Sequence, residues 1–178
     1  MSWVMTTQQR SPAHSEPIGT HPLIIDYHIS TPYVSNNILQ TAFQPREVAF
    51  FMDDIPDWET LAGQLDASIE VVRIDASKDG LEQMALWADV HHGYDAIRLF
   101  SHGSNGTLNL GTLALQNSNI DQHAQTLQRL GAALAETGDV LLYGCNVAQD
   151  ATGSHFLQRV SQAMGADVAA STNATGEK

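Results

Sequence analysis

The chain has 178 residues, of which 43% are hydrophobic, and its 8 Lys and Arg against 20 Asp and Glu give a net charge of −12. This length and apolar content suit one domain of ordinary size plus a tail. The negative charge argues against nucleic acid as a partner, because binding phosphates requires cationic side chains. No segment approaches the roughly 20 apolar residues of a membrane span, so membrane insertion is not expected.

Cysteine and histidine usage limits the possible cofactors. Cys145 is the single cysteine, which excludes an internal disulfide and any cysteine-rich zinc site. Several histidines are spaced in ways that match no common metal-ligand set, namely His14, His21, His28, His91 and His92. The sequence therefore predicts no metal and no other cofactor.

Residues 1–45 are expected to form an extended, partly ordered N-terminal leader. They are rich in Ser, Thr, Asn and His, and prolines recur often enough to prevent a long helix, at Pro12, Pro17, Pro22, Pro32 and Pro45. The short apolar run from Leu23 to Ile29 could add an edge strand. The leader has no apolar run of signal-peptide length. The folded domain is expected over residues 46–178.

This expected domain alternates strands with helices. Strands are predicted over residues 46–52, 68–75, 95–100, 138–143 and 166–170, each followed by a helical pattern or a turn, with a small hairpin over residues 106–115. Apolar runs without alternation are typical of parallel strands that are covered on both faces. The pattern predicts an α/β fold, a three-layer α/β/α sandwich whose mostly parallel sheet of five or six strands has the order 2-1-3-4-5 along the chain.

Two reactive side chains follow neighbouring strands of this sheet. His102 comes directly after the third strand, and Cys145 comes after the fourth. The carboxyl ends of parallel neighbours lie at one edge of the sheet, where α/β proteins place their ligands. A thiol beside an imidazole is a nucleophile with a base. The alternatives are a buried cysteine that only fills the core and a histidine in a polar turn.

The residues at these two strand ends carry a resemblance. Ser101-His102-Gly103 and Tyr143-Gly144-Cys145 resemble the His-Gly and Cys motifs of the caspase-like superfamily of cysteine peptidases, which includes caspases, gingipains, legumain and clostripain. A longer stretch, residues 46–176, looks like an uncharacterised domain of unknown function found near the N-termini of large bacterial adhesins and repeat-containing surface proteins.

The resemblance implies roles for particular residues. Cys145 would be the nucleophile and His102 the acid/base of a dyad, with the backbone N–H groups of Gly103 and Cys145 as oxyanion donors. Asp53 and Asp54 follow the first strand and would help form the pocket for the side chain preceding the scissile bond, which favours Arg or Lys. The caspase-like sheet usually ends with a sixth, antiparallel strand. Because the chain stops at Lys178, that strand is expected to be missing through C-terminal truncation, or supplied from the leader.

Two functions therefore follow from the sequence. The first is a caspase-like cysteine endopeptidase domain that acts on a polypeptide, its own large parent chain included. By resemblance it would lie outside the cell or on the surface of a bacterium, exported without a cleaved N-terminal signal. The alternative is a non-catalytic N-terminal module of a bacterial adhesin that retains the fold. Fold alone does not decide between them.

Overall fold

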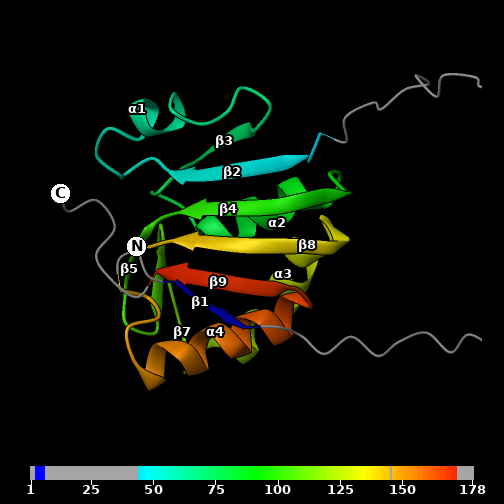
Figure 1. The fold of residues 1–178 in the computed structure, drawn as a ribbon. Helices are drawn as coiled ribbons and strands as arrows, with labels where there is room; N and C mark the ends of the chain where they lie inside the picture. Colours follow the sequence, from blue (N-terminus) through cyan, green and yellow to red (C-terminus); the bar gives the residue numbers. More distant parts are fainter. Residues whose placement is uncertain (1–2, 7–43, 145, 172–178) are drawn as a thin grey trace, which may run out of the picture. The chain divides into compact units, whose positions relative to one another are not determined.

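The computed structural model describes residues 3–6, 44–144 and 146–171, and Figure 1 shows their arrangement. The strands are β1 (Trp3–Thr6), β2 (Glu47–Met52), β3 (Glu70–Ile74), β4 (Tyr94–Phe100), β5 (His102–Ser104), β6 (Thr107–Leu110), β7 (Leu113–Gln116), β8 (Leu134–Tyr143) and β9 (Asp167–Ser171). The helices are α1 (Trp58–Ala62), α2 (Gly80–Ala88), α3 (Ile120–Gly131) and α4 (Ala151–Met164).

The main sheet has six strands in the order β1-β9-β8-β4-β2-β3 (Figure 1). Strands β3, β2, β4, β8 and β9 run parallel to their neighbours, and β1 pairs with β9 in the antiparallel direction. The expected α/β fold with a mostly parallel sheet is confirmed. The sixth strand comes from the leader, and it belongs to the same compact unit as residues 45–178. The strand considered over residues 23–29 lies outside the described residues.

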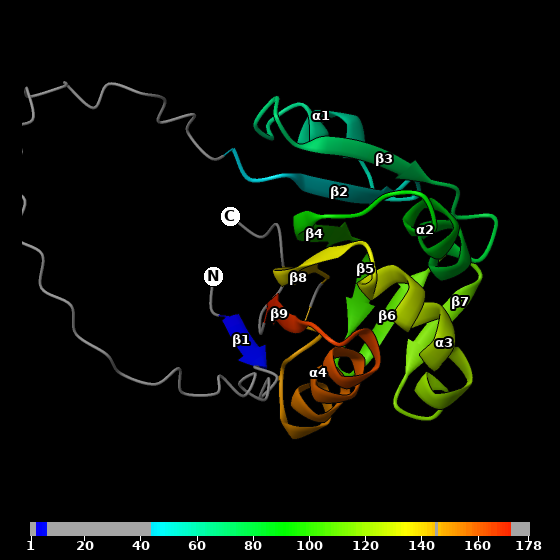
Figure 2. The same ribbon diagram turned by 90° about the vertical axis from the view of Figure 1, so that its right-hand side faces the viewer.

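The two faces of the sheet are covered differently. Alternate residues of β2, including Phe50, join the main core, and α2, α3 and α4 lie together on that side (Figure 2). On the other face the ring of Phe51 stacks on Phe100, with centroids 4.1 Å apart, and contacts Trp58 of α1. Among the described residues, the short α1 is the helix that contacts this face.

Long-range pairing corrects one predicted boundary. The apolar residues Ile120, Ala124, Leu127, Leu130 and Leu134 have helical spacing and predict a helix that reaches Leu134. The helix α3 instead ends at Gly131, and Leu134 begins β8. The reason is the neighbouring strand, because Tyr94 donates its backbone N–H to the carbonyl of Ala133 and pairs with Leu134. The sheet therefore fixes this boundary against the local helical pattern.

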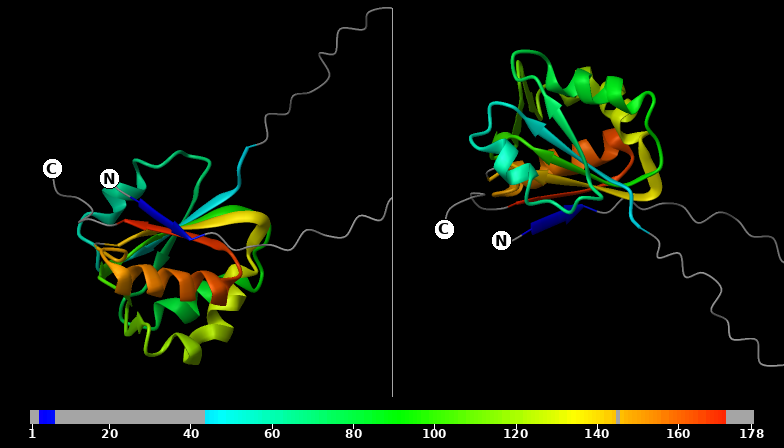
Figure 3. Two further views of the ribbon diagram at one scale, coloured as in Figure 1. Left: turned by 60° about the horizontal axis from the view of Figure 1, so that its bottom comes forward. Right: turned by 90° about the horizontal axis from the view of Figure 1, so that it is seen from above.

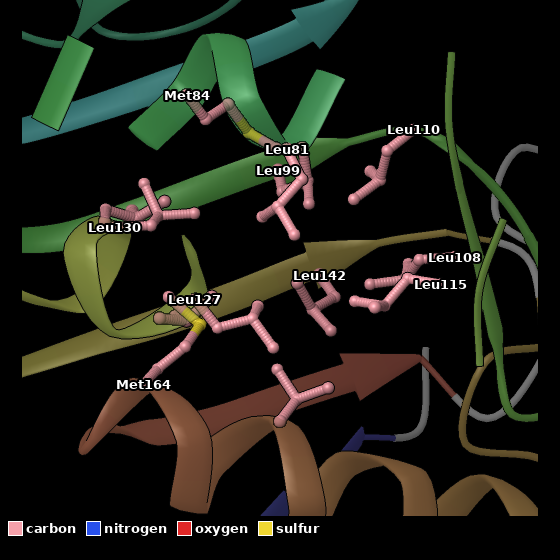
Figure 4. A pocket seen from close by; sticks show the side chains of 13 residues that line it. Leu81, Met84, Leu99, Leu108, Leu110, Leu115, Leu127, Leu130, Leu142 and Met164 are labelled. Carbon is pink, nitrogen blue, oxygen red and sulfur yellow. The ribbon is translucent and has the colours of Figure 1, made fainter. Parts of the chain in front are cut away.

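The core between the sheet and the three helices encloses a small cavity of about 20 Å³ (Figure 4). Its lining is entirely apolar and consists of Leu81, Met84, Ile97, Leu99, Leu108, Leu110, Leu115, Leu127, Leu130, Val140, Leu142, Val160 and Met164. A void of this size holds at most about one water and offers it no hydrogen-bond partner. It is a packing defect of the core and no ligand site.

Candidate active site

The ends of β4 and β8 come together as the sequence predicts. Phe100 lies opposite Tyr143 in the parallel register, and a β-carbon placed on Gly144 would lie 3.6 Å from the carbonyl oxygen of Ser101. The residues that precede the predicted base and the predicted nucleophile are therefore direct neighbours. Cys145 itself lies outside the described residues.

His102 begins β5 and its side chain is exposed. Its Nε2 atom lies 3.4 Å from the main-chain carbonyl oxygen of Asp54, in a long hydrogen bond. A carbonyl oxygen only accepts, so this contact needs the proton on Nε2 and leaves Nδ1 as the acceptor of the neutral ring. The loop after β2 therefore contacts this imidazole through its main chain.

The three residues after Cys145 are held firmly in place. Asn146 has a left-handed backbone with φ of 55°, a conformation that Asn tolerates better than most residues. Val147 accepts a 3.0 Å hydrogen bond from the N–H of Gly106, in the turn between β5 and β6, and Ala148 donates to the carbonyl of Ser171 at 3.2 Å. The hairpin that follows the predicted base thus holds the segment that follows the predicted nucleophile.

The two acidic residues after β2 have different roles. The carboxylate of Asp53 accepts from the N–H of Ala76 at 2.9 Å and from Nε of Arg73 at 3.0 Å. These two interactions, the backbone hydrogen bond first, lower the pKa of Asp53 below its ordinary value. Both oxygens are therefore occupied within the fold. Asp54 is exposed, and no hydrogen bond of its carboxylate is seen among the described residues, so only Asp54 of the two keeps an uncommitted charge.

Gly103, the other predicted oxyanion donor, lies in a small antiparallel sheet of β5, β6 and β7, where it pairs with Leu108. The predicted hairpin over residues 106–115 corresponds to β6 and β7. This small sheet adjoins the carboxyl ends of the parallel strands (Figure 1). Gly103 therefore lies in this small sheet, three residues beyond the end of β4.

Asn105 and Gly153 also lie near the site, although the sequence patterns did not identify them. A β-carbon on Gly153 would lie 2.3 Å from the carbonyl oxygen of Val147 and 2.6 Å from Oδ1 of Asn105. The start of α4 therefore packs closely on the segment after Cys145. The Asn105-Gly106 dipeptide, typical of tight hairpin turns, is the one sequence signal that could have indicated this contact.

Two further kinds of site, metal centres and membrane-spanning helices, can be assessed in the described part of the chain. Within it, no three His, Cys, Asp or Glu residues cluster so as to hold a metal ion. None of its helices is both long enough and apolar enough to cross a bilayer.

Comparisons with solved structures give weak likenesses. An aromatic-amino-acid aminotransferase from Burkholderia pseudomallei, covalently bound to pyridoxal phosphate, is 17% identical over 67% of this chain and 29% of its own length, with a TM-score of 0.38. A small-chain dehydrogenase is 10% identical over 67% of this chain and 71% of its own, with a TM-score of 0.33. Both scores are too low to support an argument about fold or function.

No curated protein matches the chain closely enough to count as a relative. One family model does match, described as a domain of unknown function (DUF4347), and it covers residues 48–178. This agrees with the uncharacterised domain that the motifs resemble. The chain therefore belongs to the DUF4347 family of domains of unknown function.

Proposed function

We propose that residues 46–178 form a caspase-like cysteine endopeptidase domain in which Cys145 is the nucleophile and His102 the acid/base. The observation that carries this proposal is the approach of Gly144 to Ser101, because it makes the residues just before the dyad direct neighbours. The strand order β3-β2-β4-β8-β9 supports it, since it is the order expected for a caspase-like sheet. The proposal includes the three-layer sandwich of that fold.

In the proposed reaction the sulfur of Cys145 attacks the carbonyl carbon of a peptide bond. The thiol proton passes to Nδ1 of His102, which returns it to the leaving amine as the C–N bond breaks. Water then hydrolyses the resulting thioester. The carbonyl of Asp54 holds the Nε2 proton and so keeps Nδ1 as the basic atom. The N–H groups of Gly103 and Cys145 stabilise the oxyanion.

The proposed substrate is a polypeptide with Arg or Lys before the scissile bond. Asp54 supports this choice because it is an exposed acidic residue whose main-chain carbonyl contacts the His102 ring. Asp53 adds no free charge, because Arg73 and Ala76 already occupy it. By the family resemblance the substrate is the chain's own large parent protein or a neighbour on the bacterial cell surface.

The single cysteine makes the test direct, because any thiol label reports on Cys145 alone. We expect iodoacetamide to alkylate the native protein at neutral pH at least about tenfold faster than the His102→Ala variant, since an adjacent imidazole favours the thiolate. His155→Ala, which removes an exposed histidine of α4, is the matched control and should label like the unaltered chain. A basic peptide substrate should be cleaved only by the unaltered chain and this control.

Equal labelling of the His102→Ala variant and the unaltered chain would contradict the dyad. The family fold would then serve as a non-catalytic module, in which Cys145 has no chemical role.

A further inference from the structure

The N-terminal strand β1 forms the outer edge of the sheet beside β9. Its register pairs Trp3 with Ser171 and Thr6 with Val168, and the Thr6 hydroxyl donates to the Val168 carbonyl at 3.2 Å. Figure 3 shows β1 running along β9 near α4. Val4 is partly buried and packs against the core, whereas Met5 is 63% exposed. The face of β1 that carries Val4 thus packs on the domain, and the face that carries Met5 is open to solvent.

The pairing of β1 reaches the candidate active site through one residue. Ser171, the fully buried last residue of β9, is the register partner of Trp3. The carbonyl of Ser171 accepts the backbone N–H of Ala148, three positions beyond Cys145 in the sequence. The end of β9 therefore lies between the N-terminal strand and the segment that follows the predicted nucleophile.

We infer that β1 is an activating strand, whose pairing with β9 holds the Asn146–Gln149 segment in the conformation that Cys145 needs for reaction. Without β1, β9 would become the edge of the sheet, and edge strands open most readily at their ends. Ser171 is such an end. Its displacement would remove the acceptor of the Ala148 N–H and release one of the contacts that fix the segment.

The connection of β1 to the domain makes this device reversible. β1 and β9 are more than 160 positions apart in the sequence, so β1 reaches β9 by long-range pairing. Its docking depends on the ladder hydrogen bonds and on the packing of Val4. Because closing a long loop costs conformational entropy, weakening these few contacts should release the strand.

Two neighbouring substitutions in the full chain test this inference. Val4→Asp puts a carboxylate against the core, and Met5→Asp puts the same group on the exposed side as the matched control. We expect Val4→Asp to speed amide hydrogen exchange at Ala148 at least about tenfold. It should also slow labelling of Cys145 by an acyloxymethyl-ketone probe at least about fivefold. Met5→Asp should change both rates by less than about twofold.

A peptide of residues 1–8 gives an independent arm of the experiment. Added in excess to the Val4→Asp variant, it should pair with the open edge of β9 and restore both slow exchange at Ala148 and rapid labelling. If Val4→Asp fails to fold, Thr6→Val replaces it, since that change removes only the hydroxyl bonded to Val168. Unchanged exchange at Ala148 after release of β1, or unchanged labelling of Cys145, would overturn the inference.

The inference rests on the proposed function, but the two can fail separately. If His102→Ala labels as fast as the unaltered chain, the dyad is wrong. Exchange at Ala148 still reports whether β1 controls the segment after Cys145, because that measurement needs no catalysis.

Discussion

The Nε2 atom of His102 lies 3.4 Å from the main-chain carbonyl oxygen of Asp54. Because this contact uses the main chain, an Asp54→Asn change should leave the imidazole oriented and the labelling of Cys145 by iodoacetamide unchanged. The same change removes the exposed charge proposed to select the substrate, so cleavage after Arg or Lys should fall by at least about tenfold in kcat/KM. Cleavage after Arg at the original rate would contradict the pocket role of Asp54.

Asp53 should instead act on stability. Its carboxylate accepts from Ala76 and Arg73, and its pKa in the folded protein is below the ordinary 3.8. A lowered pKa stabilises the fold above pH 3.8, and this contribution is lost as the pH falls through the folded-state pKa. Asp53→Asn should therefore lower the melting temperature at neutral pH, and the difference from the unaltered chain should narrow below pH 3.8.

Asp57→Asn is the matched control for this titration. Asp57 is exposed in the same loop, with a left-handed φ of 56° and no side-chain capping bond, and Asn tolerates that conformation. Its melting temperature at neutral pH should match that of the unaltered chain, because the change removes no hydrogen bond of the Asp57 side chain. A constant difference between Asp53→Asn and the unaltered chain down to strong acid would contradict the assigned hydrogen bonds.

The parallel sheet was predictable because its signal is local. Residues 48–52 of β2 are all buried, and a strand buried on both faces appears in the sequence as a continuous apolar run. The turns after β4 and β8 carry small residues next to reactive ones. This local signal identified His102 as a candidate without any knowledge of strand pairing. Each of these inferences needed only neighbours along the chain.

The remaining features depend on distant partners. The family resemblance implied a pocket role for Asp53, which follows a strand, whereas its partner Arg73 lies on the adjacent edge strand β3. Similarly, the contacts of Val147 with Gly106 and of Ala148 with Ser171 join segments far apart in sequence. No periodicity encodes such contacts, because they follow from how strands and loops pack together.

Arg98 and Glu47 form an ion pair on the sheet face opposite the three long helices, with Nε 2.6 Å from Oε2 and side chains that are 25% and 17% exposed. Arg98→Leu leaves the Glu47 carboxylate partly buried without its cation, which should cost about 1 to 3 kcal/mol in urea unfolding. Adding Glu47→Leu should recover part of this loss. A double variant whose cost equals the sum of the two single changes would show that the pair is energetically unimportant.

Leu142 lines the small core cavity and is 2% exposed. Leu142→Ala should enlarge the cavity and destabilise the protein by about 2 to 5 kcal/mol, because the rigid strand β8 limits collapse around the missing atoms. Leu86→Ala on the outer side of α2, where Leu86 is 57% exposed, should change the free energy of unfolding by less than about 0.5 kcal/mol. A comparable loss at both positions would contradict the assignment of this core.

Gly153 affects both the stability of the fold and the candidate site. The first turn of α4 has no room for a β-carbon beside the Val147 carbonyl and Asn105. Gly153→Ala must displace either the helix start or the segment after Cys145. We expect a loss of about 1 to 3 kcal/mol from overpacking, together with labelling of Cys145 that slows by at least about fivefold as the segment shifts.

Gly63→Ala is the control for a glycine that has space. A β-carbon there would meet its nearest atom, the Glu59 carbonyl oxygen, at 3.4 Å, and its φ of −66° suits any residue. This variant should match or slightly exceed the stability of the unaltered chain, by up to about 1 kcal/mol, because alanine restricts the unfolded state. If Gly153→Ala lost stability while Cys145 labelled at the original rate, the close packing of α4 would serve the fold alone. The geometry of the segment after Cys145 would then have to depend on Gly106 and Ser171.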